Sequence, residues 1–369
     1  MRMRIVMLFD LDYFFAQCEE LRNPLLKDKP VVVCVFSGRT EDSGAVSTAN
    51  YVARKYGVKS GMPIYVAKKK LQGVDAFFLP VDRPFYEEIS GRIMSLFRSY
   101  ADDFEQVGID EAYLDVTEKT RGNFKHAFEL AQEMKQRLRN TLGLTCSIGI
   151  GPSKLVAKIA ADASKPDGLT VVEPENVVSF LSPLPVDRLL GVGRKTVERM
   201  RLMGVTTIGD LAVYDVQKLA EVFGKKLGSY FHEAANGVDE EPVRERGEAE
   251  SISRIATLKV DTHDIEAVAA KINVLSEEVH SRLMERGAKF KTVGIIAVMS
   301  DLSIRSRAKS FDNPTSDLEV LKKTGRELFD KLLSEYELPV KRVGVKVSNL
   351  ASDEQRQSRI TRFLQNSNG

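Results

Sequence analysis

The sequence contains few of the residues from which thiolate and imidazole metal sites are built. Its 369 residues include three cysteines, four histidines and no tryptophan. Cys18, Cys34 and Cys146 stand far apart, and no Cys-x-x-Cys spacing occurs. This pattern argues against a zinc site and a disulfide framework, and it fits a reducing, cytoplasmic compartment. A metal bound here would need oxygen ligands, as magnesium does.

Long hydrophobic runs are also missing, so we expect no membrane association. The opening MRMRIVMLFDLD is basic and then apolar, but Asp10 interrupts it after about five apolar residues, too few for a signal peptide. We interpret it as a strand. Hydrophobic residues make up 43% of the sequence and charged residues 29%, as in ordinary globular proteins of several domains. The net charge of +2 does not by itself indicate nucleic-acid binding, so the placement of the positive charges matters.

The order of predicted elements divides the chain into three parts. Alternating strands and helices up to about residue 172 predict an α/β domain with a small insertion. Residues 173–239 predict helices with glycine-punctuated turns, and the polar, charged stretch 237–251 predicts a linker. From Ser251 the order β-α-β-β-α-β predicts a ferredoxin-like small domain, followed from about residue 351 by a polar tail.

Acidic residues occur at two places where apolar strands would bury them. Asp10 and Asp12 lie at the end of the first strand, and Asp110 and Glu111 interrupt GIDEAYLDV. Strand alternation would point the last two to opposite faces, so both serve one site only at a strand end, bulge or hairpin tip, which Gly108 favours. If the strands are neighbours, Asp10, Asp110 and Glu111 converge, and two Mg²⁺ between them would suit phosphoryl transfer. The alternative is that each acid is a surface charge or pairs with a nearby Arg or Lys.

A second group of residues suits a triphosphate. The stretch SGRTEDSGAVSTANYVARKYGV places Arg39, Thr48, Tyr51 and Arg54 around small residues. Tyr51 and Arg54 are three apart on a predicted helix and share a face, and guanidinium and hydroxyl groups bind phosphate well. Lys165, in ASKPDG, could provide another contact. The alternative is an exposed helix with incidental polar residues and an ordinary lysine at a helix end.

The later part of the sequence carries signals for DNA binding. LLGVGRKTVERMRLMGV (189–205) is a helix-hairpin-helix pattern, whose hairpin amides hold a DNA phosphate, and FGKKLGSYF (223–231) is a looser example. SIRSRAKSF places basic residues at period two on one strand face, where they could follow a phosphate backbone or could form an ordinary solvent face. These residues are Arg305, Arg307 and Lys309, with Lys341, Arg342 and Lys346 in the last strand.

Together these residues resemble a known enzyme family over essentially the whole chain. FDLDYFFAQ, KPVVVCVFSGR, SGAVSTANYVARKYGVKSGMP, GIDEAYLDV, SIGIGPSKLVAKIAADASKPDG, the helix-hairpin-helix and SISRIATLK resemble a Y-family, lesion-bypass DNA polymerase of the archaeal DNA polymerase IV type. The resemblance implies a right-hand polymerase with a ferredoxin-like palm (1–13 and 81–172), small fingers (14–80) and a helical thumb with the helix-hairpin-helix (173–239). A linker (240–250), a β-α-β-β-α-β little finger that binds DNA (251–350) and a tail (351–369) would follow.

The resemblance also implies roles for individual residues. Asp10, Asp110, Glu111 and the carbonyl of Leu11 would hold two Mg²⁺ during attack of a primer 3′-hydroxyl on the α-phosphate of a dNTP, with release of pyrophosphate. Phe15 matches the position that excludes a 2′-hydroxyl. Further residues match triphosphate contacts (Thr48, Tyr51, Arg54, Lys165) and small residues over the nascent base pair (Ala45, Ser47, Gly61). Small side chains there imply low fidelity and translesion synthesis. Asp12 is not a ligand in the family pattern.

The C-terminal tail predicts a further binding partner. QSRITRFL matches a motif that binds a sliding clamp, through Gln357, Ile360, Phe363 and Leu364; a tail that packs back on the domain is the alternative. We expect a monomer that binds primer–template DNA and dNTP. One competing hypothesis is a nucleotide cyclase on a similar two-metal palm, which would need neither the helix-hairpin-helix nor the basic strand. Another is a catalytically silent DNA-binding scaffold, against which the intact acid set argues.

Overall fold

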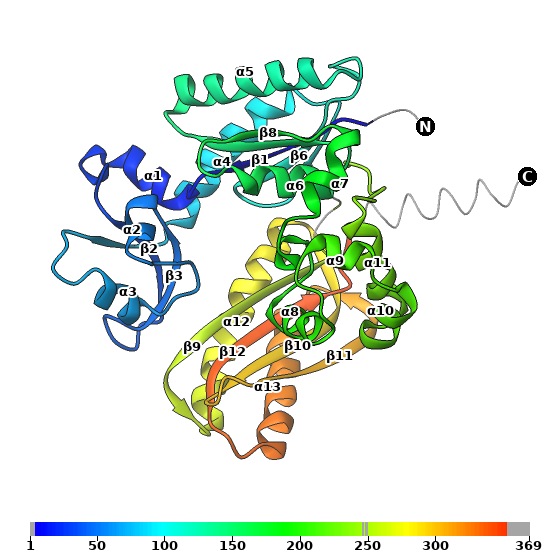
Figure 1. Cartoon of the computed structure of the whole chain (residues 1–369). Helices are drawn as coiled ribbons and strands as arrows, with labels where there is room; N and C mark the ends of the chain where they lie inside the picture. The colour runs from blue at the N-terminus through cyan, green and yellow to red at the C-terminus, as the bar shows by residue number, and fades with distance from the viewer. Residues whose placement is uncertain (1–3, 246, 248–249, 353–369) are drawn as a thin grey trace, which may run out of the picture. The chain divides into compact units, whose positions relative to one another are not determined.

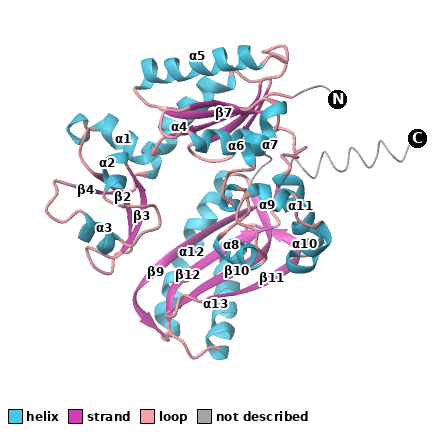
Figure 2. Ribbon diagram, viewed as in Figure 1, coloured by secondary structure: helices cyan, strands magenta, loops and turns pink. Residues whose placement is uncertain are grey.

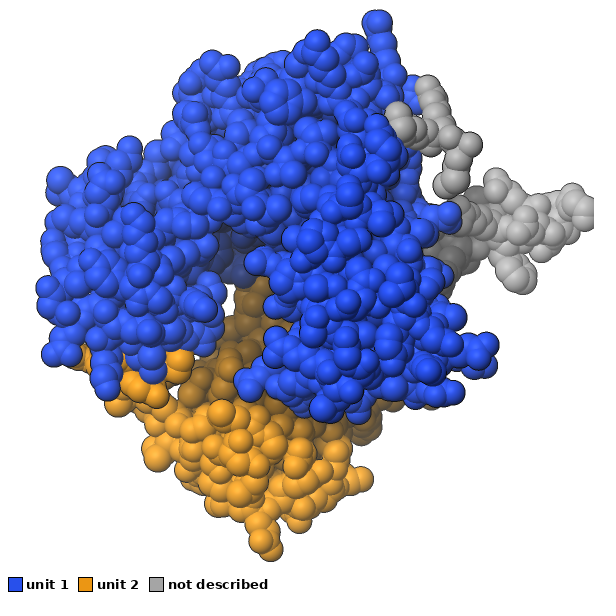
Figure 3. All heavy atoms as spheres, viewed as in Figure 1, with its two compact units in different colours: residues 1–34, 46–62, 66–246 blue, residues 35–45, 63–65, 247–369 orange. Residues whose placement is uncertain are grey.

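The computed structural model describes residues 4–245, 247 and 250–352. The chain divides into two compact units (Figure 3). Unit 1 contains residues 1–34, 46–62 and 66–246, and unit 2 contains residues 35–45, 63–65 and 247–369. None of the helices in the described part of the chain is long and apolar enough to span a lipid bilayer.

Unit 1 is built on a five-stranded sheet in the order β5-β6-β1-β7-β8 (Figures 1 and 2). Its central strand β1 (Val6–Leu11) is buried along its whole length because helices cover both faces. The odd residues of β1 share a core with α4 (Arg83–Arg98) and α5 (Phe124–Leu142), while Val6 and Leu8 pack against α6 (Lys154–Ala163). Asp10 belongs to this second set, so its side chain lies on the α6 side. The remaining strands are β5 (Asp103–Gln106), β6 (Glu111–Asp115), β7 (Cys146–Gly151) and β8 (Leu169–Val171).

A close approach of α6 to the sheet depends on one glycine. A Cβ atom on Gly149 of β7 would lie 2.1 Å from the carbonyl oxygen of Ala157 and 2.2 Å from the amide nitrogen of Ala161, so any side chain would push the helix away. The backbone of α6 can therefore rest on β7. This contact brings the side chains of α6 to the end of β1.

The region after β1 forms a smaller, three-stranded sheet in the order β3-β2-β4. Its strands are β2 (Val31–Phe36), β3 (Gly44–Ala49) and β4 (Phe77–Pro80), with β4 parallel to β2. The helices of this region are α1 (Phe14–Arg22), η1 (Pro24–Leu26), α2 (Tyr51–Lys55) and α3 (Ile64–Lys70). The small residues before α2 form the strand β3, which places Thr48 just ahead of the helix that carries Tyr51 and Arg54.

The predicted helical region follows β8 and has its own core. It contains η2 (Pro174–Asn176), α7 (Val177–Leu181), η3 (Val186–Arg188), α8 (Arg194–Leu202), α9 (Ile208–Ala212), α10 (Val216–Phe223) and α11 (Lys225–Ala235). Gly193 is the residue before α8, and Gly224 joins α10 to α11. Both predicted hairpins therefore fall at glycine turns between helices.

The beginning of the predicted linker packs against unit 1. The side chain of Val243 is buried with Val6, Leu8, Tyr113, Ala157 and Ala161. Arg4 donates hydrogen bonds to the backbone carbonyls of Asp239, Glu240 and Glu241, and the Asp239 carboxylate accepts from the amide of Leu155 in the first turn of α6 at 2.8 Å. Residues 239–245 thus belong to the packed structure of unit 1, which their polar composition did not predict.

The sheet of unit 2 has the order β11-β10-β12-β9, with β13 (Ala351–Ser352) paired to β10. Its elements follow one another as β9 (Ser251–Thr262), α12 (Ile265–Glu285), β10 (Ala288–Met299), β11 (Ile304–Thr315), α13 (Leu318–Glu335) and β12 (Val340–Ser348). This is the predicted β-α-β-β-α-β order. Both helices share one core with alternate residues of the strands, such as Val293, Ile295 and Val345, and so cover one face of the sheet (Figure 2).

The basic residues of β11 share a face, as predicted, but it is the helix-covered face. Arg305, Arg307 and Lys309 lie opposite Ala297, Ile295 and Val293 of β10, which face the helices. Directly opposed residues share a face. Arg307 pairs with Glu335, and Lys309 approaches Glu327 at 3.3 Å. Arg307 and Lys309 therefore pair with acids of α13 at the sheet edge, and Arg305 lies over the ring of Tyr336. The interpretation of this face as a phosphate track stays a prediction.

The open face of the same sheet carries other cations. Gly344 of β12 pairs with Ile296 of β10 and Ile255 of β9, so these three residues point away from the helices. Arg342 and Lys346 lie two residues to either side of Gly344 and share that face. Among the residues that the structure describes, neither Arg342 nor Lys346 forms an ion pair. Two members of the predicted basic surface are thus available on the open side, whereas the third, Lys341, pairs with Asp261 at 2.9 Å.

Candidate active site

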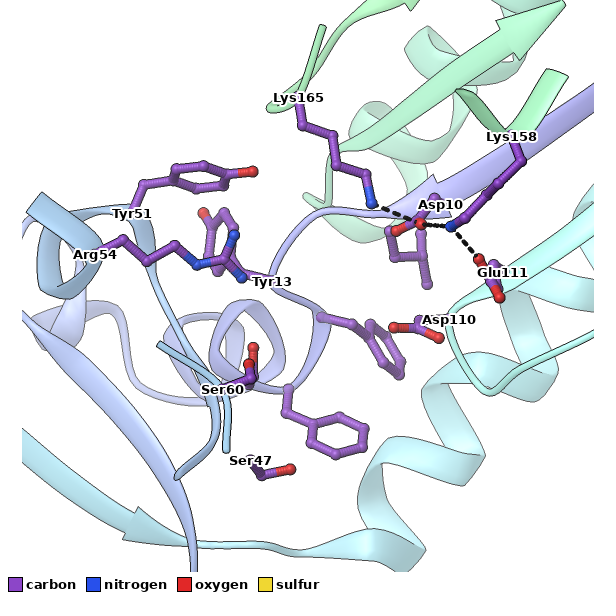
Figure 4. A pocket seen from close by; sticks show the side chains of 14 residues that line it. Asp10, Tyr13, Ser47, Tyr51, Arg54, Ser60, Asp110, Glu111, Lys158 and Lys165 are labelled. Atoms are coloured by element: carbon purple, nitrogen blue, oxygen red, sulfur yellow. Dashed lines mark hydrogen bonds and ion pairs between the residues drawn. The ribbon is translucent and has the colours of Figure 1, made fainter. Parts of the chain in front are cut away.

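A pocket of about 370 Å³ lies in unit 1 where β1, the β5–β6 turn, α2 and the end of α6 meet. Figure 4 shows its side chains. Most of the predicted metal and nucleotide residues line it. They are Asp10, Leu11, Phe15, Thr48, Tyr51, Arg54, Asp110, Glu111 and Lys165, with Tyr13, Phe14, Ser47, Ser60 and Lys158 completing the wall.

The three carboxylates converge through the pairing of β1 with β6. Glu111 is the first residue of β6 and lies directly opposite Asp10 in the ladder. Asp110 belongs to the turn between β5 and β6, and its carbonyl accepts a hydrogen bond from the amide of Leu11 at 2.9 Å. The pair thus sits at a hairpin tip, the local departure from alternation that the sequence required. Gly108 makes room for it, because a Cβ there would lie 3.0 Å from Asp110 Oδ1 and 3.2 Å from Glu111 Cγ.

Two lysines neutralise part of this acid cluster. Lys158 Nζ lies 2.9 Å from Asp10 Oδ2 and 2.7 Å from Glu111 Oε2, and Lys165 Nζ lies 2.6 Å from Asp10 Oδ2 (Figure 4). Burial opposes ionisation of Asp10, but the charges of the two lysines outweigh it and lower its pKa. Burial likewise disfavours the charged form of Lys158, yet Asp10 and Glu111 raise its pKa on balance. Asp10 is therefore ionised, and both Asp10 and Glu111 are already paired with lysine.

Asp110 is the carboxylate that the chain leaves without a counter-ion. Within the described residues it forms no ion pair, and its pKa is raised, first by burial and then by the charges of Asp10 and Glu111. As the side chains stand, no three His, Cys, Asp or Glu residues of the described chain are gathered closely enough to hold a metal ion. The donors are nonetheless hard oxygens with an uncompensated negative charge. They suit an oxygen-preferring divalent cation once the ammonium groups give way.

The opposite wall of the pocket is formed by cations, hydroxyls and an aromatic ring. Arg54 lies over the ring of Tyr51, with its guanidinium carbon 4.7 Å from the ring centroid, and its Nε donates to the carbonyl of Ala49 at 2.9 Å. Tyr13 packs edge-on against Tyr51. Phe15 stacks on Tyr86 with 4.4 Å between ring centroids. Both Arg54 and Phe15 are thus held in place by neighbouring rings.

Not every residue singled out from the sequence reaches this pocket. Arg39 belongs to unit 2, where it pairs with Asp261 at 2.6 Å and donates to the carbonyls of Leu258 and Lys341. The interpretation of Arg39 as a phosphate contact beside Thr48 is therefore wrong. Ala45 and Gly61 do not line the pocket, whereas Ser47 does.

Two residues of the pocket wall, Lys158 and Tyr13, were not predicted from the sequence. Lys158, Asp162 and Lys165 follow one another at spacings of four and three, which places residues on one side of a helix. This spacing, which runs from α6 into the loop after it, could have indicated that Lys158 lies beside Lys165. Tyr13 has a left-handed backbone (φ 37°) just before α1, and nothing in its neighbourhood in the sequence indicated its place in the wall.

Comparison with known families supports the resemblance to Y-family DNA polymerases over nearly the whole chain. Residues 9–162 match the impB/mucB/samB family, residues 249–360 match its C-terminal domain, and residues 187–239 match the thumb domain of DNA polymerase-iota. The chain is 48% identical over 365 residues to DNA polymerase IV of Nitrosopumilus maritimus, which covers 99% of this chain and 100% of that protein. It is 44% identical to DNA polymerase IV 1 of Methanosarcina mazei, over 95% of this chain and 97% of that protein.

Solved structures agree with these matches. A Y-family DNA polymerase chimera, Dbh-Dpo4(243-245)-Dbh, superposes with a TM-score of 0.89 at 38% identity and covers 95% of this chain and 100% of that chain. DinB from Sulfolobus solfataricus gives a TM-score of 0.63 at 37% identity with the same coverage. The right-hand fold, with its ferredoxin-like palm, helical thumb and little finger, is thereby confirmed, as is the family resemblance. The cyclase and scaffold hypotheses fall with it, because the chain belongs to the Y-family of lesion-bypass, DNA-directed DNA polymerases.

Proposed function

We propose that this chain performs low-fidelity, template-directed DNA synthesis past lesions, with two Mg²⁺ at the Asp10, Asp110 and Glu111 site. The observation that carries the proposal is that three carboxylates and a cationic, hydroxyl-bearing wall face each other across one pocket of about 370 Å³. Nucleotidyl transfer needs both groups, because a negatively charged triphosphate must approach a negatively charged metal site. The substrates are a dNTP and the 3′-hydroxyl of a primer annealed to template DNA.

The acid wall would hold the metal ions. Asp10, Asp110, Glu111 and the carbonyl of Leu11 offer the oxygen donors, and Asp110 forms no ion pair with any described residue. When bound, two Mg²⁺ would lower the pKa of the primer hydroxyl and neutralise the leaving pyrophosphate. Lys158 and Lys165 lower the pKa of Asp10 and so keep it ionised and ready to act as a ligand.

The opposite wall would bind and orient the nucleotide. Tyr51, Arg54, Thr48 and Lys165 present phenol, guanidinium, hydroxyl and ammonium groups that suit the triphosphate oxygens. Phe15, fixed against Tyr86, would lie under the sugar and exclude a 2′-hydroxyl. Ser47 leaves space near the base, which fits an enzyme that accepts damaged templates.

DNA would be held by both units through their own elements. The hairpin glycines before α8 and between α10 and α11 expose backbone amides for phosphate contacts, as in the predicted helix-hairpin-helix. Arg342 and Lys346 on the open face of the unit 2 sheet supply positive charge that no described residue pairs. We assign the palm, fingers, thumb and little finger to residues 1–13 with 81–172, 14–80, 173–239 and 251–350.

Three remaining assignments rest on the sequence. The motif formed by Gln357, Ile360, Phe363 and Leu364 lies outside the described residues, and we propose that it binds a sliding clamp. We propose further that the enzyme acts as a monomer, in the cytoplasm. Size-exclusion chromatography with light scattering checks the monomeric state. Binding of a purified clamp to the full chain and to a chain ending at residue 352 checks the clamp motif.

Primer extension tests the proposed reaction. Wild-type enzyme with Mg²⁺, dNTP and a labelled primer on undamaged template should extend the primer, and Asp110→Ala should not, while both bind the primer–template with similar affinity in fluorescence anisotropy. A template with an abasic site or an oxidised guanine then tests bypass. DNA binding without extension by the wild type would overturn the proposed chemistry. Activity that required no template would point to a different transferase reaction.

A further inference from the structure

A second aspartate at the end of β1 is buried beside the pocket and does not line it. Asp12 is 1% exposed. Its Oδ1 accepts a hydrogen bond from Ser147 Oγ at 2.8 Å, and its Oδ2 accepts from Thr145 Oγ1 at 2.9 Å and from the backbone amide of Asp167 at 2.8 Å. The carboxylate thus joins three separate segments, and the metal site described above does not use it.

One of these bonds holds the loop that carries Lys165. Asp167 has a left-handed backbone (φ 53°), a conformation that costs a non-glycine residue energy unless its surroundings fix it. The Asp12 carboxylate holds its amide from one side. From the other side its own carboxylate pairs with Lys135 at 2.8 Å and with Arg139, both from α5. Lys135 also donates to the carbonyl of Gly168 at 3.1 Å.

Lys165 stands two residues before this fixed point, and its ammonium group enters the pocket (Figure 4). A lysine side chain is long and has several rotatable bonds. The loop sets the Cα atom from which this side chain reaches into the pocket, where its Nζ pairs with Asp10 and, at 3.1 Å, with Asp162. Asp12 and Asp167 help to fix that placement, because they tie the loop to the end of β1, which is buried along its whole length, and to the long helix α5.

We propose that Asp12 is a positioning residue for the nucleotide: by holding the amide of Asp167, it sets Lys165 where the triphosphate binds. The inference rests on the proposed function, since it takes Lys165 as a triphosphate contact. A purely structural aspartate would instead lower the stability of the fold without a selective effect on nucleotide affinity. The two roles differ in their dependence on Lys165.

The chemistry of the contacts defines the variants. Asp12→Ala removes both oxygens and releases the loop. Asp12→Asn can hold the loop in place, because its amide oxygen can accept hydrogen bonds from Asp167 and Thr145 while its NH₂ group donates to Ser147 Oγ. Positioning therefore predicts that Asn restores most of the function lost in Ala. A direct electrostatic effect of the Asp12 charge would instead leave Asn as defective as Ala.

Single-turnover extension gives the apparent dissociation constant for dNTP and the maximal rate separately. For Lys165→Ala we expect the dissociation constant to rise about 30-fold, and for Asp12→Ala about 10-fold, as for a lost charge-assisted contact. The maximal rate should stay within about threefold. In the Lys165→Ala background, Asp12→Ala should add less than about twofold, because the lysine that it positions is gone. Additive effects of the two changes would overturn the proposal.

Asp167→Asn tests the same loop if Asp12→Ala fails to fold. Asn tolerates the left-handed backbone, and residue 167 is exposed, so this variant should remain folded. It loses the ion pairs with Lys135 and Arg139, and we expect the dissociation constant for dNTP to rise about threefold. An unchanged constant in Asp167→Asn would count against the proposal by itself.

A matched control and the Lys165 variant separate the possible failures. Thr120→Ala removes a buried hydroxyl that donates to the carbonyl of Val116, far from the loop in sequence and outside the pocket. It should lower the thermal midpoint without changing nucleotide affinity. If Lys165→Ala leaves the affinity unchanged, the proposed role of Lys165 fails. If Lys165→Ala weakens binding and Asp12→Ala does not, only the positioning role of Asp12 fails.

Discussion

The five-stranded sheet of unit 1 and the sheet of unit 2 carry charge in opposite arrangements. At the end of the unit 1 sheet, acids gather and lysines pair with only part of them, so that Asp110 remains without a counter-ion among the described residues. At the edge of the unit 2 sheet, Arg307 and Lys309 of β11 pair with glutamates of α13, whereas Arg342 and Lys346 on the open face pair with none of the described residues. Charges that the chain pairs by itself stabilise the fold. Charges that it leaves unpaired mark where ligands of opposite sign are expected to bind.

The largest effect should come from an unpaired acid compared with a paired one. Asp110→Ala should reduce the rate of primer extension by at least about 10³-fold, because it removes a charge on which metal binding depends. Glu335→Ala, which removes an acid paired with Arg307, should leave the rate within about threefold. Single-turnover extension measures both. Equal losses in the two variants would break the comparison.

DNA affinity should depend on the open face of the unit 2 sheet more than on its helix-covered face. We expect the double change Arg342→Ala and Lys346→Ala to weaken duplex binding about tenfold at moderate salt and to reduce the salt dependence of binding by about two counter-ions. The matched double change Arg305→Ala and Lys309→Ala should weaken it no more than about twofold. Anisotropy titrations at several salt concentrations give both quantities. A larger effect of the β11 pair would reverse the assignment of faces.

The stability of the metal-free protein should rise when Asp110 loses its charge. Its pKa is raised in the folded state, so the folded state holds the proton more tightly than the unfolded chain, and the carboxylate costs stability once the pH exceeds its ordinary pKa. Asp110→Asn should therefore increase the free energy of unfolding at pH 7 by about 1 kcal/mol. The gain should shrink as the pH falls toward 4 and Asp110 becomes protonated. Urea titrations in EDTA at both pH values check this, and a gain that grew on acidification would contradict it.

We expect the smallest effect from breaking an exposed ion pair between β11 and α13. Lys309 and Glu327 are about half exposed, and exposed pairs contribute little. Glu327→Gln should lower the free energy of unfolding by less than about 0.5 kcal/mol and leave DNA affinity unchanged. Thermal melts and anisotropy provide the measurements. A markedly weaker DNA affinity would show that α13 takes part in binding.

The sequence predicted the elements of unit 2 and the hairpin position of Asp110 and Glu111 because both depend on local pattern. The β-α-β-β-α-β order follows from periodicity, and two adjacent acids after a glycine could share a site only at a turn. The face occupied by the β11 cations was not predictable from period two alone. Alternation tells which residues share a face, but the packing of α13 decides which face is covered.

Tertiary packing also explains why the sequence did not predict the places of Arg39, Lys158 and Val243. Arg39 lies nine residues before Thr48 in a stretch of small residues, but the chain between them folds back at β3, and the side chain joins Asp261 in unit 2. Lys158 was missed because a lysine in an amphipathic helix is ordinarily a solvated charge. Its role depends on Gly149, which lets α6 approach the strand that ends in Asp10. Val243 stood alone in a polar stretch, and only its partners in β1 and α6 reveal that it is buried.

Gly108 carries a consequence for how this enzyme tolerates mutation. It has no side chain to react or bind, yet a methyl group in its place would press on Asp110 Oδ1 and Glu111 Cγ at 3.0 and 3.2 Å and shift both by a few tenths of an ångström. Sites of this kind lose function when their groups move by about 0.5 Å. A saturation scan of primer extension should therefore find position 108 sensitive to substitution, although its glycine takes no part in the chemistry.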